Sequence, residues 1–221
     1  MAAPLVALVT AGSAGTGEAT ARRFAIEGFR VVVNYANNAD RAEAVVKDLE
    51  SLSPLGSNGQ TNFIAIRADL GDRSQIIKLV DETVSIMGKL DVVFSNGGWT
   101  HLRNFSDLND NVLEEDWDKC FNMNVKSHLF LMHAAKEHLD KTQGAFITTA
   151  SLAGVKASGS SLVSSTCELP NLVSLLIPCQ AYSVTKAAQI HLVKGLAISA
   201  GPNIRVNTVS PGLMLTVGHP S

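Results

Sequence analysis

An apolar run followed at once by a glycine-rich turn stands near the N-terminus: Leu5-Val6-Ala7-Leu8-Val9-Thr10-Ala11-Gly12-Ser13-Ala14-Gly15-Thr16-Gly17. The run 5–10 is short enough for a buried strand, and 18–27 continues with the apolar spacing of a helix. Glycines let the backbone approach a pyrophosphate, and the start of a helix offers free N–H groups and a positive dipole. In this context of strand, turn and helix, the glycines indicate a dinucleotide site rather than a merely tight turn.

The rest of the chain alternates short apolar runs with segments of helical length. Further strands are expected at 30–33, 63–66, 90–94, 145–149 and 204–209, and further helices at 39–52, 74–87, 113–139 and 181–199. This alternation predicts an α/β fold, a doubly wound parallel sheet within a single domain over 1–221. Ligands bind beyond the carboxyl ends of such strands, where the segments at 10–17, 69 and 95–98 fall.

Composition excludes several functional classes. The formal net charge of −2 over 221 residues gives no basic field for nucleic acid or an anionic membrane. Three cysteines without a C-x-x-C pair argue for a reducing compartment, and no apolar run reaches membrane-spanning length, so we expect a cytoplasmic protein. His128, His133 and His138 are five apart, a poor match for one helix face, and are expected to be solvated or partly buried rather than metal ligands.

The end of the second strand bears on the choice of dinucleotide. A fold selective for NAD usually places an acid here to bind the ribose 2′-hydroxyl. The chain instead reads Asn34-Tyr35-Ala36-Asn37-Asn38, has no acid before Asp40, and continues with Arg41. Nothing here would repel a 2′-phosphate, so the sequence favours NADP(H), with NAD(H) left open.

Tyr182 and Lys186 are four residues apart in a run of good helix formers. That spacing puts both side chains on one helix face, where an ammonium lowers the pKa of a phenol and suits it to acid–base work. Alone, the pair is better explained as part of a solvated helix face, where such pairs often occur by chance. The motifs elsewhere in the chain give it weight.

Several segments together resemble the classical short-chain dehydrogenase/reductase family, over nearly all of 4–216. The turn at 10–17 is similar to Thr-Gly-x-x-x-Gly-x-Gly, with Ala11 at the first glycine. Ser95-Asn96-Gly97-Gly98 stands where Asn-Asn-Ala-Gly is usual, and Pro211-Gly212 with Thr216 matches Pro-Gly-x-x-x-Thr. The resemblance implies a Rossmann-type sheet and an NAD(P)(H)-dependent oxidoreductase that interconverts a carbonyl and a secondary alcohol by hydride transfer.

The resemblance also implies roles for individual residues and no metal. Tyr182 would be the acid–base group, Lys186 would lower its pKa and hold the nicotinamide ribose, Ser151 would bind the substrate oxygen, and Asn124 would complete a proton relay. The implied cofactor-binding residues are Thr10, Gly12, Ser13, Gly15, Thr16, Gly17, Asn34, Asp69, Leu70, Asn96, Gly98, Tyr182, Lys186, Pro211, Gly212 and Thr216. Members of the family usually form homodimers or homotetramers through helices that correspond to 113–139 and 181–199.

Two departures from the family pattern stand out. Ser151 and Tyr182 are 31 positions apart (182 − 151), against about a dozen in the family, and removal of 163–180 would restore 13. Valine codons begin with GT and one glutamine codon is CAG, the usual ends of an intron, so 163–180 is hypothesised to be a retained in-frame intron. The tail 217–221 also begins with valine, and a seventh strand is expected to be missing. Sequencing the transcript across both junctions separates this hypothesis from a natural lid insertion with truncation.

The departures leave a second function open. Because both affect the substrate side, the chain could bind cofactor and yet be catalytically impaired. An epimerase or dehydratase fits the glycine pattern less well. Trp99, His101, Leu102 and Phe105 suggest a partly aromatic substrate wall, although such residues also commonly pack a loop.

Overall fold

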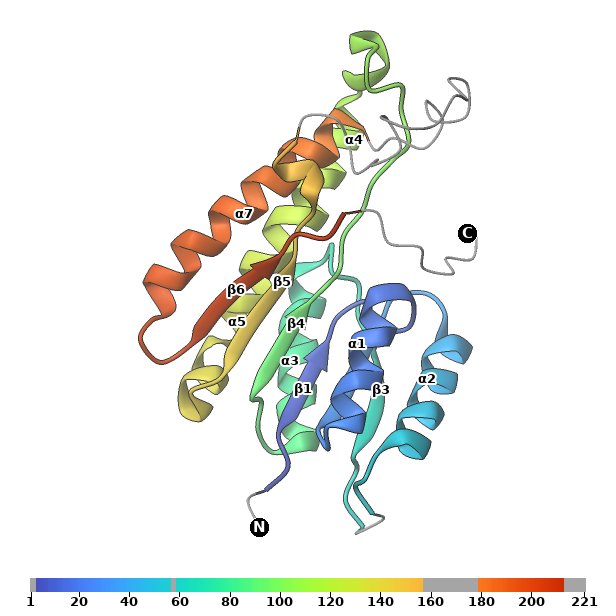
Figure 1. Ribbon diagram of the computed structural model, residues 1–221, viewed down its shortest axis with the longest axis vertical. Coiled ribbons are helices and arrows are strands. Elements are labelled where there is room, and N and C mark those ends of the chain that lie inside the picture. The colour runs from blue at the N-terminus through green and yellow to red at the C-terminus, as the bar shows by residue number, and fades with distance from the viewer. Residues whose placement is uncertain (1–2, 57–58, 157–178, 213–221) are drawn as a thin grey trace.

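The computed structural model describes residues 3–56, 59–156 and 179–212, which form one sheet covered by helices on both faces (Figure 1). The strands are β1 (Val6–Val9), β2 (Arg30–Tyr35), β3 (Phe63–Arg67), β4 (Val92–Ser95), β5 (Ala145–Thr149) and β6 (Arg205–Val209). Their order is β3-β2-β1-β4-β5-β6, and every neighbouring pair is parallel. This confirms the predicted doubly wound α/β fold, whose strand order reverses between β1 and β4, where ligands bind in such sheets.

The helices divide between the two faces of the sheet. They are α1 (Gly15–Ile26), α2 (Ala39–Leu52), α3 (Arg73–Met87), α4 (Glu114–Phe121), α5 (Ser127–Thr142) and α7 (Gln180–Ala200), with short turns η1 (Leu108–Asn111), η2 (Asn122–Lys126) and η3 (Leu152–Gly154). Helices α1 and α2 cover one face, and α3, α5 and α7 cover the other (Figure 1).

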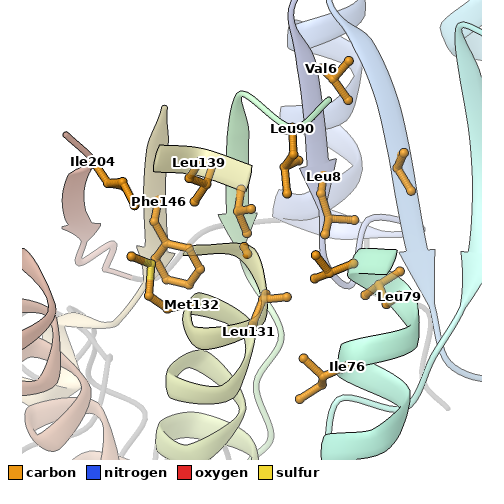
Figure 2. Packing of buried hydrophobic residues seen from close by; sticks show 14 of the residues in the cluster. Val6, Leu8, Ile76, Leu79, Leu90, Leu131, Met132, Leu139, Phe146 and Ile204 are labelled. Atoms are coloured by element: carbon orange, nitrogen blue, oxygen red, sulfur yellow. The ribbon is translucent and has the colours of Figure 1, made fainter. Parts of the chain in front are cut away.

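Alternation of side chains along the strands explains the two cores. Leu8 of β1 points to the α3 and α5 side, where it joins Leu131 and Phe146 (Figure 2). Its neighbour Val9 points the other way and packs with Val33 and the α1–α2 layer. Since β1 is buried on both faces, its residues must all be apolar, which is the reason for the run that opens the chain.

The expected helix 113–139 consists of three consecutive pieces, α4, η2 and α5. The middle piece is a π-helical turn, closed by a hydrogen bond from the Ser127 amide to the Asn122 carbonyl. Such turns occur frequently at functional sites, and Asn124 lies inside this one. His128 follows on α5 and is completely buried, so its predicted partial exposure is wrong, while His133 is exposed and His138 is half-buried.

Several sequence predictions lie outside the described residues: 163–178 of the suspected insert, Thr216 and the tail 217–221. The last two insert residues are described, and Cys179 directly precedes α7 while Gln180 begins it. In the parts of the chain that the structure describes, no helix combines the length and apolar character needed to cross a membrane. Within the same ranges, no three His, Cys, Asp or Glu residues are placed to hold a metal ion.

Candidate active site

The glycine-rich turn between β1 and α1 is packed so closely that two of its glycines cannot carry a side chain. A Cβ on Gly17 would lie 2.3 Å from the Ala11 carbonyl oxygen, and one on Gly12 would lie 2.9 Å from the Val9 carbonyl oxygen. Among the described residues, no side chain caps α1, which begins after Ala14. The turn and the uncapped helix end together form a backbone cradle that fits the pyrophosphate of a dinucleotide.

Ala11 has a strained backbone conformation, which the glycine found at this position in the family pattern would adopt without strain. Its φ is +48°, in the left-handed region that disfavours a Cβ. Its amide donates to Asn34 Oδ1 at 3.1 Å, and Asn34 Nδ2 donates to the Ala68 carbonyl at 3.0 Å. The buried Asn34 side chain therefore ties the glycine turn to β3 and shapes the turn from behind.

The loops after β1 and β4 are joined by the Thr10 hydroxyl. It accepts from the amides of Asn96 at 2.9 Å and Gly97 at 3.3 Å. A Cβ on Gly97 would lie 2.2 Å from Leu70 Cδ1, so the loop after β3 closes against the same segment. The ends of β1, β3 and β4 thus form one continuous edge, as the sequence motifs predict.

The other predicted cofactor residues lie along the same edge. Asp69 is exposed and accepts from the Gly71 amide at 2.8 Å, while Ser13 is buried in the glycine turn. Gly15 has a φ of +54° and begins α1, with Thr16 next to it. At the far end, the Pro211 carbonyl accepts from the Leu152 amide at 2.9 Å, and Gly212 is the last described residue.

Asn124 connects the loop after β4 to α7. Its Oδ1 accepts from the Trp99 amide at 2.7 Å, and its Nδ2 donates to the Trp99 carbonyl at 2.9 Å and to Thr185 Oγ1 at 3.0 Å. A Cβ on Gly98 would lie 3.2 Å from Asn124 Oδ1 and 3.6 Å from Lys186 Nζ. Asn124 is completely buried, so its side chain holds the site together from inside.

Ser151 and Tyr182 are adjacent in space although 31 positions separate them in the chain. Ser151 is the residue before η3, where its Oγ accepts from the Ala153 amide at 3.2 Å, and its hydroxyl lies close enough to Tyr182 to act on the pKa of the phenol. Ser183 Oγ donates to the Ala153 carbonyl at 2.7 Å, which fastens η3 to α7. Two independent contacts therefore hold the serine turn against the tyrosine helix.

Gly154 is a site residue that the sequence analysis did not single out. A Cβ there would lie 2.6 Å from the carbonyl carbon of Lys186 and 2.7 Å from the amide nitrogen of Ala187. The turn after Ser151 thus rests directly on the backbone of α7. The sequence signal for Gly154 was its position three residues after Ser151, because a glycine near a proposed site can mark a place where two backbone segments come close together.

The electrostatics of the Tyr182–Lys186 pair differ from the expectation. Burial raises the pKa of Tyr182, and the nearby Ser151 hydroxyl opposes this only in part. Lys186 Nζ lies 5.5 Å from the centroid of the tyrosine ring and donates to the Thr149 carbonyl at 2.7 Å. Burial lowers the pKa of Lys186 to about 8. The predicted lowering of the tyrosine pKa is therefore reversed, because burial dominates and the ammonium is held on the strand side.

An apolar cluster closes the space beside Tyr182. Cys120 and Cys179 are buried in it, and Trp99 and Trp117 pack against them. Of the predicted aromatic wall, Trp99 contacts the His101 ring edge-on at a centroid distance of 6.0 Å, and Leu102 is about half exposed. Trp99 thus packs against the same buried cluster as Tyr182.

The parallel sheet with a glycine cradle at its switch point defines a dinucleotide-binding α/β protein. The short chain dehydrogenase family matches residues 5–166, and the enoyl-(acyl carrier protein) reductase family matches residues 173–219. The chain therefore belongs to the short-chain dehydrogenase/reductase family.

Individual relatives cover almost the whole chain. A probable tetrahydroxynaphthalene reductase of Zymoseptoria tritici is 36% identical over 94% of this chain and 67% of its own length. A versicolorin reductase of Emericella nidulans is 34% identical over 96% of this chain and 69% of its own length. A short chain dehydrogenase of Burkholderia cenocepacia, solved in complex with NADP, is 32% identical with a TM-score of 0.76, over 96% of this chain and 75% of its own.

Proposed function

We propose that this protein is an NADP(H)-dependent oxidoreductase that reduces a carbonyl compound to a secondary alcohol, or runs the reverse reaction. The observation that carries the proposal is the contact between the Ser151 hydroxyl and the Tyr182 phenol, one helical turn before Lys186. This group lies at the sheet edge that also carries the glycine cradle. The family membership and the NADP complex of the Burkholderia relative support the same chemistry.

The protein's own residues would supply proton transfer and orientation. NADPH, when bound, supplies the hydride. Ser151 would hydrogen-bond the substrate oxygen and stabilise the negative charge that develops there. Tyr182 would donate its proton to that oxygen, and the raised pKa keeps the phenol protonated at neutral pH, as a proton donor must be.

Lys186 and Asn124 would support Tyr182 in this reaction. The ammonium of Lys186 would stabilise the phenolate after the proton has left. Asn124 hydrogen-bonds Trp99 in the loop after β4 and Thr185 on α7, and these contacts support a role for it in the proposed proton relay. Gly98 would let the cofactor approach both residues, since a side chain there would crowd them.

The preference for NADP(H) rests on the end of β2. Arg41 is exposed in the first turn of α2, and the exposed Arg67 donates to the Ala36 carbonyl at 3.0 Å. Two cations thus flank the segment where a 2′-phosphate would lie, and 34–39 carries no carboxylate to repel it. We expect 36–38 and Arg41 to bind that phosphate.

The substrate class follows from the wall beside Tyr182. Trp99 and Trp117 make this cluster aromatic, and Lys119 Nζ lies 4.6 Å from the centroid of the Trp99 ring. Of the fungal relatives named above, the probable tetrahydroxynaphthalene reductase carries a fused-ring aromatic compound in its name. Aromatic ketones and quinone-like carbonyls are therefore the first substrates to test.

Titration with NADPH and NADH, followed by cofactor fluorescence, tests the first half of the proposal, and a panel of carbonyl compounds tests the second. We expect tighter binding of NADPH and consumption of NADPH with an aromatic carbonyl. Binding without turnover, recovered when 163–180 is deleted, would favour the catalytically impaired alternative. Absence of binding of both NADPH and NADH would overturn the proposal. Light scattering of the same sample separately tests whether the protein forms the expected dimer or tetramer.

A further inference from the structure

Lys186 is held by a closed ring of hydrogen bonds in which Gln189 is the third member. Lys186 Nζ donates to the Thr149 carbonyl at 2.7 Å and to Gln189 Oε1 at 2.9 Å, and Gln189 Nε2 donates to the same carbonyl at 3.2 Å. Gln189 is completely buried and Lys186 is 3% exposed. The spacing of three residues on α7 places both side chains on one helix face.

The chemistry of the three groups leaves one arrangement of the amide. An ammonium can only donate and a carbonyl can only accept, so the amide oxygen must face Lys186 and the amide nitrogen must face Thr149. A flipped amide would bring two donors and two acceptors into contact. Two of the three N–H groups of Lys186 are therefore used by the ring, and one is left for the active site.

We propose that Gln189 is a positioning residue for Lys186, whose side-chain amide clamps the ammonium against β5 and thereby sets the pH at which the lysine loses its charge. The inference rests on the proposed function for its catalytic consequence but not for its geometry. A buried glutamine with both ends bonded to the lysine and its carbonyl partner has a specific orienting effect that an apolar residue could not supply.

The surroundings of Lys186 explain why a neutral acceptor matters. Tyr182 faces it from α7, Cys120 from α4 and the buried His128 from α5. Cys120 acts to raise the pKa of Lys186, but its own pKa is raised, chiefly by its hydrogen bond with Cys179, so it stays neutral. Within the described residues, no carboxylate is among the groups that act on the lysine. The Gln189 dipole thus takes the place of a counter-ion.

The test compares Gln189→Glu and Gln189→Leu with the control Val193→Ala, a buried site about one turn further along α7 than Gln189. Protein with 13C-labelled lysine, without added cofactor, is titrated by NMR, and Lys186→Met assigns the signal. A carboxylate at 189 should raise the midpoint of Lys186 by about one pH unit, and leucine should lower it by a similar amount. Val193→Ala should lower the melting temperature and leave the midpoint unchanged.

The second readout is the pH profile of carbonyl reduction. If carbonyl reduction needs a charged Lys186, the alkaline limb of the pH–rate profile should move in each Gln189 variant in the same direction as the NMR midpoint of Lys186. Unchanged Lys186 midpoints in both Gln189 variants would overturn the inference. If Gln189→Leu does not fold, the midpoint in Gln189→Glu alone decides. Absence of turnover in the unmodified protein would refute the proposed function, whereas the NMR titration would still decide the role of Gln189.

Discussion

Substitution of Gly154 by alanine tests whether contact between η3 and α7 sets the geometry of the site. The added Cβ would lie 2.6 Å from the carbonyl carbon of Lys186 and 2.8 Å from its carbonyl oxygen. Both are backbone atoms, so no side chain can rotate away. The turn that carries Ser151 must then separate from the helix that carries Tyr182.

The size of the separation follows from these distances. Ordinary van der Waals contact begins at 3.4 Å, against the 2.6 Å available, so the two elements must part by about 0.8 Å. A displacement of about 1 Å at a reacting centre costs on the order of 100-fold in rate. Overpacking of this kind also costs about 1–3 kcal/mol of stability. We expect kcat to fall 10- to 100-fold. NADPH binding should change less, because the glycine turn lies on a different loop from Gly154.

Steady-state kinetics, cofactor titration and thermal melting of the Gly154→Ala protein measure these effects. Gly195→Ala is the matched control, since Gly195 lies on the same helix and a Cβ there would meet nothing within 4 Å. That variant should gain up to about 1 kcal/mol from helix propensity and keep its kcat. A Gly154→Ala protein with the kcat and melting temperature of the unmodified chain would refute the reasoning.

Two further predictions concern strain and protonation. Ala11→Gly should raise the free energy of unfolding by about 0.5–1 kcal/mol, because relief of the left-handed φ (about 1–2 kcal/mol) exceeds the entropy cost of glycine; a lower melting temperature would contradict this. Burial, and secondarily Lys186, lowers the pKa of His128 from 6.5 to about 3, so below pH 6.5 only the unfolded chain takes up the proton and stability is lost as pH falls. This loss of stability should reach about 2 kcal/mol at pH 5, and it should vanish in His128→Gln, whose side chain can still pair with Ser95. Denaturant unfolding at pH 7 and pH 5 measures the loss in both proteins. An equal pH dependence of stability in the two would count against a neutral buried His128.

The features that the sequence predicts correctly are local. The apolar run at β1 and the turn that follows are set by neighbours in the chain, so hydrophobic pattern and glycine spacing identify them. The same holds for the i, i+4 relation of Tyr182 and Lys186 on α7. The doubly wound parallel sheet follows from the alternation of strands and helices, whereas the order of the strands comes from the structure.

The features that the sequence does not predict arise between distant segments. Asn34 joins the glycine turn to β3, and His128 is buried because Ser95 on β4 pairs with it at 2.6 Å. Gly154 matters only because α7 passes beside it, and Lys186 turns to β5 because Thr149 offers a carbonyl there. The partners in each of these contacts are far apart in the sequence, so hydrophobic periodicity and motif spacing do not show which segments meet.

Replacement of Tyr182 by phenylalanine tests the central claim most directly. The variant keeps the ring and its packing but has no proton to give. With NADPH and a carbonyl substrate of the unmodified protein, kcat/KM should fall by about 10²- to 10⁴-fold. The Kd for NADPH, measured by fluorescence, should stay within about twofold of the value for the unmodified protein. The reason is that most of the cofactor binding is assigned to the glycine turn and little of it to the phenol oxygen. Retention of turnover in Tyr182→Phe would contradict the assignment of this residue as the proton donor.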